Sequence, residues 1–258
     1  MTRPDGGPRP WPLRVLSWNV CELRGDVEAL VRAVREIDPD VLLVQEAPRL
    51  VLPRTRLERF ADRIGRRILV GGRGGRGLAV LGTDAVARQV IRRGMHPVRQ
   101  RLTDANSTYP RGVAAVRLSV PGGGAVVVCA IHLALQEENR LRHAAHVVDL
   151  VRSAGAPVIV GGDLNETAER PARQRLGTVL HDPIPDSEWT FPARRPQRRI
   201  DGILTTAGVQ VVAARAVTST SGVAPERFRE ASDHLPVQLD VEVMGAGASR
   251  GRGARSGT

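Results

Sequence analysis

The feature that most constrains the fold of this chain is a series of short apolar segments, each stopped by glycine or a polar residue. The clearest is residues 157–160, which Gly161 and Gly162 end and which Asp163 and Asn165 follow. Residues i and i+2 of a strand point to the same side, so a carboxylate and a carboxamide should leave the end of one buried strand together. The glycines would let a ligand approach closely. The plainer interpretation is an Asx turn, because Gly, Asp and Asn are common turn residues.

The other segments predict more strands than helices. Helical spacing of apolar residues runs from Asp26, a suitable N-cap, to Pro39, and recurs around residues 57–64 and 141–151. A hairpin is expected where Gly122–Gly124 joins two apolar segments. Hairpins mixed with strand–helix–strand crossovers favour an α/β or α+β sandwich with helices outside over a purely parallel sheet. Strands are expected near residues 13–20, 41–44, 67–71, 77–82, 86–91, 113–120, 125–133, 157–160, 200–205, 209–217 and 235–243.

The composition allows a sizeable core and favours an anionic partner. At 258 residues, 41% of them apolar, the chain is one large domain or two small ones. The net charge of +11 favours a nucleic-acid partner. All 38 basic residues are arginine, which suits bidentate contacts with phosphate, although this usage also indicates a GC-rich coding bias.

We expect a Pro/Gly-rich lead-in over residues 1–12, one domain over 13–244 and a disordered Gly/Arg/Ser tail over 245–258. No apolar segment is long enough for a signal peptide or a membrane span, so a cytoplasmic protein is expected. Cys21 and Cys129 lie in apolar segments and are expected to be buried free thiols. The sequence leaves the oligomeric state open.

Three motifs have plain explanations. Residues 72–77 fit G-x-G-x-x-G, but a strand is expected where the dinucleotide fingerprint needs a helix, so an arginine-rich turn that touches a phosphate is preferred. His143 and His146 could share a metal on the third helix, but no carboxylate completes the site, and a solvated helix face is expected. Ser232 precedes an acid and a histidine, yet nothing specifies the rest of a serine triad.

Side chains able to perform catalysis stand at the ends of six predicted strands. They are Asn19, Glu46, His132, Asp163 with Asn165, Asp201, and Asp233 with His234. Each alone could simply cap a strand, but together they gather oxygen ligands and two imidazoles. Glu46, Asp233 and Asn19 offer hard oxygen atoms, which suit Mg²⁺ or Mn²⁺ rather than zinc.

The remaining residue types suit phosphoryl chemistry. Asp163 could orient or deprotonate an attacking water, and Asn165 could donate hydrogen bonds to a phosphoryl oxygen. Asp201 is a suitable partner for His234, because an adjacent carboxylate raises the pKa of a histidine and keeps it protonated. Such a histidine would stabilise a phosphorane-like transition state or protonate the leaving oxygen.

Seven motifs resemble those of the endonuclease/exonuclease/phosphatase superfamily and follow its order over residues 17–236. They are SWN, VQE, PRG, IHL, GGDLN, RID and SDHLP, of which the GDxN and SDHxP pair is specific. The resemblance implies a four-layer αββα sandwich of two mixed sheets with helices outside. It also implies divalent-metal-dependent hydrolysis of phosphate esters by in-line attack of a metal-activated water.

The resemblance implies a role for each matching position. The metal-site residues are matched by Asn19, Glu46 and Asp233. Asp163 and Asn165 match the pair that orients water and contacts phosphate. The catalytic histidines are matched by His132 and His234, the partner of His234 by Asp201, and an arginine that contacts substrate phosphate by Arg111.

Some positions depart from the family pattern. His132 stands where abasic-site endonucleases carry a tyrosine, so the chain is more similar to the deoxyribonuclease and sphingomyelinase branches. No acid near residues 77–81 is available to pair with His132. Cys21 stands where abasic-site enzymes have an acid or amide, and Gly202 where many relatives carry an aromatic residue.

Three functions remain open at this stage. A phosphodiesterase acting on DNA or RNA, a nuclease, is favoured by the charge and by Arg111. The alternative is a phosphatase or phosphodiesterase for a small phosphoester or a phospholipid headgroup. A non-catalytic binding module on the same fold is third, because every catalytic position carries a competent residue. The sequence leaves open whether one or two metal ions bind.

Overall fold

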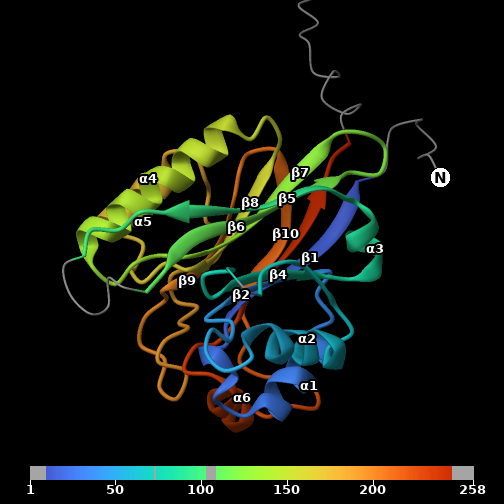
Figure 1. Ribbon diagram of the computed structural model, residues 1–258, viewed down its shortest axis with the longest axis vertical. Helices are drawn as coiled ribbons and strands as arrows, with labels where there is room; N and C mark the ends of the chain where they lie inside the picture. Colours follow the sequence, from blue (N-terminus) through green and yellow to red (C-terminus); the bar gives the residue numbers. More distant parts are fainter. Residues whose placement is uncertain (1–9, 73, 103–108, 246–258) are drawn as a thin grey trace, which may run out of the picture.

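The computed structural model describes residues 10–72, 74–102 and 109–245. Two β-sheets pack face to face, and helices cover the outer face of each (Figure 1). The predicted sandwich of two mixed sheets with helices outside is therefore confirmed. The first strand already begins at Trp11, inside the expected lead-in, and almost all of the expected tail lies outside the described residues.

Six strands form the first sheet, in the order β10-β11-β1-β2-β4-β3. Within it β1 and β2 are parallel and α1 (Val27–Ile37) crosses between them, whereas the other neighbours are antiparallel. The strands are β1 (Trp11–Asn19), β2 (Val41–Gln45), β3 (Arg67–Val70), β4 (Leu78–Gly82), β10 (Val209–Ala216) and β11 (Val237–Val243).

Five strands form the second sheet, in the order β5-β6-β7-β8-β9. Here β7 and β8 are the parallel pair, with α4 (Glu137–Ser153) as their crossover, and the predicted hairpin joins β6 to β7. The carboxyl ends of each parallel pair lie at one edge of their sheet, which gathers the residues that follow the strands. The strands are β5 (Val90–Val98), β6 (Arg111–Ser119), β7 (Ala125–His132), β8 (Val158–Asp163) and β9 (Asp201–Thr205).

Three apolar clusters hold the four layers together. Aliphatic residues of both sheets, such as Val15, Val128 and Ile159, fill the space between them. One outer cluster lies beneath α1, α2 and α6, where Trp18 stacks on Phe228 with ring centroids 5.6 Å apart, and another beneath α4 and α5. The helices are α1 (Val27–Ile37), α2 (Pro53–Arg63), α3 (Asp84–Arg88), α4 (Glu137–Ser153), α5 (Pro171–Gly177) and α6 (Pro225–Ala231), with a 3-10 turn η1 (Cys21–Leu23). Among the described residues, no helix combines the length and apolarity needed to cross a bilayer.

Local sequence signals explain the bounds of α1. The side chain of Asp26 accepts a hydrogen bond of 3.0 Å from the backbone N–H of Ala29, a cap that contributes about 1 kcal/mol. The helix ends where Asp38 adopts a left-handed conformation with φ of 50°, just before Pro39. This helix therefore begins and ends where the sequence predicts.

The two glycines of β8 serve close packing of the strands. A Cβ on Gly162 would lie 1.9 Å from the backbone oxygen of Ile131, and one on Gly161 would lie 2.6 Å from Leu43 Cδ1. Their contacts are with protein atoms, so the expectation that they admit a ligand is replaced by a packing role. The close approach sets Asp163 in register opposite His132 on one side and opposite Asp201 on the other.

Several expectations are corrected. Residues 86–91 are not one strand: Thr83 caps α3 through a hydrogen bond from the N–H of Val86, and β5 begins only at Val90. His143 is fully buried rather than solvated. The ring faces β6, where its Nε2 lies 3.2 Å from the carbonyl oxygen of Gly112. Cys129 is buried as expected, but Cys21 is only half-buried.

Candidate active site

The predicted residues meet in one cavity at the edge where β1, β2, β7 and β8 end. The cavity has a volume of about 480 Å³. The predicted residues that line it are Glu46, Arg111, His132, Asp163, Asn165, Asp233 and His234. Asn19 and Asp201 are buried behind it and bind lining residues. A larger hollow of about 970 Å³ beside α1 and α6 contains none of these residues.

Asp163 is the centre of the cluster and is only 2% exposed. Its Oδ2 atom lies 3.2 Å from His132 Nε2, accepts a hydrogen bond of 3.1 Å from Asn19 Nδ2 and lies 3.7 Å from His234 Nε2. Burial raises the pKa of Asp163, but the charge of His234 and the interaction with His132 outweigh burial and hold it below the usual carboxyl range. Asp163 is therefore ionised and contacts both histidines.

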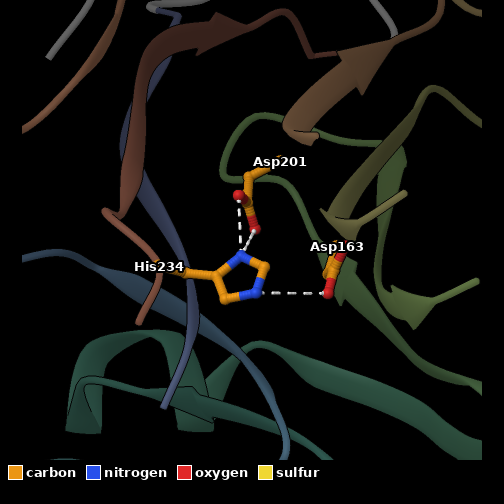
Figure 2. Close-up of side chains that lie close together, drawn as sticks. All are labelled: Asp163, Asp201 and His234. Carbon is orange, nitrogen blue, oxygen red and sulfur yellow. Dashed lines mark hydrogen bonds and ion pairs between the residues drawn. The ribbon is translucent and has the colours of Figure 1, made fainter. Parts of the chain in front are cut away.

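His234 lies between two carboxylates, as Figure 2 shows. Its Nδ1 atom is 3.0 Å and 3.2 Å from the two oxygens of Asp201. Burial lowers the pKa of His234, but the charges of Asp201 and Asp163 outweigh it and raise the pKa to about 10. The N–H of Trp18 donates to the His234 carbonyl at 2.9 Å, which fixes the backbone. His234 is therefore a cation at neutral pH, with both ring nitrogens protonated.

His132 has a different environment. Its Nδ1 atom is buried and has no hydrogen-bond partner among the described residues. The ring meets Tyr109 edge to face, with centroids 5.7 Å apart. Burial lowers the pKa of His132 and the charge of Arg111 lowers it further, while Asp163 opposes both. His132 is therefore neutral at neutral pH.

Arg111 supplies a buried cation at the wall of the cavity. It is 3% exposed, its Nε and Nη1 atoms have no partner in the described part of the chain, and burial lowers its pKa. The guanidinium carbons of Arg111 and Arg49 lie 4.5 Å and 3.7 Å from the centroid of the Tyr109 ring. Because buried N–H groups without a hydrogen-bond partner are costly, this position favours an anion.

Asn165 continues from Asp163 in a left-handed turn with φ of 52°. Its backbone N–H donates to Asp163 Oδ1 at 2.9 Å, and its side-chain Nδ2 donates to the carbonyl of Leu133 at 2.9 Å. The side chain is half-buried at the wall of the cavity. A carboxamide nitrogen carries two protons, so one remains for a ligand.

Glu46 and Asp233 offer carboxylate oxygens beside Asn19. Asn19 donates to Glu46 Oε1 at 3.2 Å, and both carboxylates approach the Cys21 thiol. Burial raises the pKa of that thiol to about 11, and Asp233 and Glu46 contribute to the increase. Neither acid forms an ion pair with arginine within the described ranges. This oxygen-rich, acidic group fits a hard divalent cation.

The sequence did not indicate several residues of the cavity. They are Arg49, Tyr109, Leu135, Phe191, Arg198 and Ile200. Tyr109 had a usable signal, since it is the only tyrosine of the chain and directly precedes the PRG motif. The ring of Phe191 packs on His234, with centroids 4.7 Å apart.

Comparisons with known proteins agree with this geometry. A family described as "Endonuclease/Exonuclease/phosphatase family" matches residues 16–234. An endonuclease/exonuclease/phosphatase family protein from Bacteroides thetaiotaomicron has a similar fold, with a TM-score of 0.73 and 19% identity over 91% of this chain and 99% of that one. A mannosyl-6-phosphatase from the same species has a TM-score of 0.68 and 19% identity over 89% and 99%.

A third similar structure is TDP2 from D. rerio in complex with a single-strand DNA product. Its TM-score is 0.64, with 16% identity over 89% of this chain and 98% of that one. At these identities the neighbours show the fold alone. No curated protein sequence matched the chain. The family match spans most of the sequence, from the end of β1 to His234. The chain therefore belongs to the endonuclease/exonuclease/phosphatase family.

Proposed function

We propose that this protein is a divalent-metal-dependent phosphodiesterase that acts on nucleic acid, DNA or RNA. The observation that carries the proposal is an ionised Asp163 in contact with a cationic and a neutral histidine, at the wall of a cavity that also holds Arg111. The Nε and Nη1 atoms of this buried arginine have no hydrogen-bond partner among the described residues. Titratable groups with pKa values pushed apart by their surroundings are typical of acid–base sites. The family membership supports hydrolysis of a phosphoester.

Glu46, Asp233 and Asn19 would hold Mg²⁺ or Mn²⁺. A bound ion there would neutralise phosphate charge and lower the pKa of a bound water. Ligand atoms of Asp163, Asp201 and His234 also lie within 4.8 Å of one another, a spacing that a metal could use. We prefer the acidic group, because a protonated His234 has no lone pair to donate.

The chain's own residues supply the remaining steps. Asp163 orients the attacking water and accepts its proton. Arg111 and the free N–H of Asn165 bind phosphoryl oxygens. His234 donates the proton on Nε2 toward the phosphoryl or leaving oxygen, while Asp201 holds the ring through Nδ1. Proton transfer from such a positioned histidine contributes about 10²–10⁴-fold to the rate.

The test is hydrolysis of bis(p-nitrophenyl) phosphate and plasmid DNA by purified protein with Mg²⁺ or Mn²⁺. Asp163→Ala should abolish turnover, since it removes the group that contacts the water and both histidines. EDTA should do the same. If the wild type and Asp163→Ala are equally inert on every substrate and with both metals, the protein is a binding module rather than an enzyme.

The alternative substrate is a small phosphoester or a phospholipid headgroup. The compact volume of the cavity, about 480 Å³, favours it, and one structural neighbour is named as a sugar phosphatase. A nucleic-acid substrate binds with a steep salt dependence that reflects the phosphates contacted. A flat dependence of KM on salt together with rapid turnover of a small phosphoester would establish the alternative.

A further inference from the structure

A second cavity lies against the active-site cavity and takes no part in the chemistry above. Its volume is about 570 Å³. Three prolines and three glycines line it together with Arg49, Leu50 and Arg76. The glycines are Gly72, Gly74 and Gly77, from the part of the sequence that mimics a nucleotide-binding fingerprint but leads into the strand β4.

The two cavities share one wall. Arg49 lines both, and Pro110 faces the second cavity while its neighbours Tyr109 and Arg111 face the first. Gly77 packs directly on this wall, because a Cβ there would lie 2.4 Å from the hydroxyl of Tyr109 and 3.3 Å from Arg49 Cδ. A ligand bound at Arg111 could therefore extend past Arg49 into the second cavity.

The charges of the second cavity are unbalanced. Of the residues that the structure describes, the lining contains two guanidinium groups, those of Arg49 and Arg76, and no carboxylate. Arg49 is already paired with Glu22, at 3.2 Å through Nε and 3.1 Å through Nη2. Arg76 makes only a 3.5 Å contact to the carbonyl oxygen of Arg111 and has no carboxylate partner among the described residues. The guanidinium of Arg76 is thus available for an anion.

The rest of the lining is apolar. Leu50 is 62% exposed and begins a run of three exposed aliphatic residues that ends with Leu52. Val51 and Leu52 both have positive φ, 49° and 52°, a strained conformation for such side chains. A cationic group beside exposed aliphatic and proline surface matches the two parts of a nucleotide, its phosphate and its flat base.

We propose that the second cavity is a subsite for the nucleotide that neighbours the scissile phosphate, with Arg76 on its phosphate and Leu50 against its sugar and base. The subsite rests on the proposed phosphodiesterase function and gives it a polymeric substrate. A small phosphoester would fill only the first cavity.

The experiment compares kcat/KM for a fluorescent single-stranded oligonucleotide with that for bis(p-nitrophenyl) phosphate, at two salt concentrations with Mg²⁺. Arg76→Ala should lower the ratio of the two values about tenfold, mainly through KM for the oligonucleotide, and should reduce the salt slope by about one. The matched control is Arg152→Ala, an exposed arginine in the last turn of α4, which should leave the ratio at its wild-type value.

Leu50 provides an independent pair of variants on an exposed side chain, where folding is not at risk. Leu50→Asp should lower the ratio by repelling the phosphate, and Leu50→Arg should raise it. An unchanged ratio in Arg76→Ala and in both Leu50 variants overturns the subsite. A wild type that cleaves the small diester but not the oligonucleotide overturns the subsite and the nucleic-acid substrate together, and leaves phosphodiester hydrolysis standing. A wild type inert on both substrates overturns the phosphodiesterase function itself.

Discussion

The two histidines of the site are equally buried, but one is charged and the other is neutral. His132 and His234 are each 5% exposed, and both lie near Asp163 Oδ2. On the side of β9, Asp201 accepts a hydrogen bond from Nδ1 of His234. The charges of Asp201 and Asp163 raise the pKa of His234 to about 10. On the side of β7, Nδ1 of His132 has no partner in the described residues, and burial together with Arg111 lowers the pKa.

The difference shows that neighbouring charges rather than burial assign the roles. Burial opposes the charged form of both imidazoles, so it cannot distinguish them. What distinguishes the two imidazoles is the carboxylate of Asp201, which lies beside Nδ1 of His234. One histidine is consequently set up as a proton donor, and the other as a neutral hydrogen-bonding group beside Asp163 and Arg111.

The largest expected effect is the loss of the cationic histidine. His234→Ala should lower kcat by about 10³-fold with little change in KM, because its main interaction forms in the transition state. His132→Ala should cost less, about 10²-fold. Steady-state kinetics on bis(p-nitrophenyl) phosphate would measure both. A change confined to KM in His234→Ala, or equal losses in the two variants, would contradict the division of roles.

The next effect concerns the carboxylate that makes the histidines differ. Asp201→Asn should lower kcat by about 10²-fold, since it removes the charge that keeps His234 protonated. The alkaline limb of the pH profile should also move to lower pH. Asp149→Asn, a change of the same kind at an exposed site on α4, is the control. If kcat falls while the alkaline limb of the pH profile stays at the same pH, Asp201 acts only by positioning the His234 ring and not through its charge.

The smallest effect is on stability. The pKa of His234 is raised from an ordinary value of about 6.5 to about 10, so its stabilising contribution is complete below about pH 6.5 and is lost as pH rises through 10. The free energy of unfolding should fall by on the order of 2 kcal/mol between about pH 7 and 10, as urea denaturation would measure. His234→Gln should remove most of that slope, while His132→Gln should leave it. Equal slopes in all three proteins would refute the pKa difference.

The strand ends could be predicted because they depend on local patterns. Asn19, Glu46, His132 and Asp163 each follow an apolar segment that forms a strand, and the two helical crossovers make the pairs parallel. These side chains then converge because the carboxyl ends of each parallel pair lie at one edge of their sheet. The motifs added Arg111, whose buried position is fixed by the start of β6.

The rest depends on tertiary packing that no local pattern records. Arg49 and Phe191 come from loops, and reach the cavity only because Tyr109 and His234 lie beside them. His143 looks solvated from its spacing, but the side of α4 that bears it packs on β6. The apolar residues Val86 and Ala87 predict a strand, but the cap at Thr83 makes them part of the short helix α3.

Gly162 limits how this chain can diverge. Any side chain there would collide with the oxygen of Ile131 and push apart the two strands that end in His132 and Asp163. In a saturation library the position should therefore tolerate no replacement. Variants at Gly162 should lose as much activity as a protein in which both His132 and Asp163 are substituted. Gly162 has no functional group, yet evolution should be as little able to replace it as to replace His132 and Asp163, whose register it maintains.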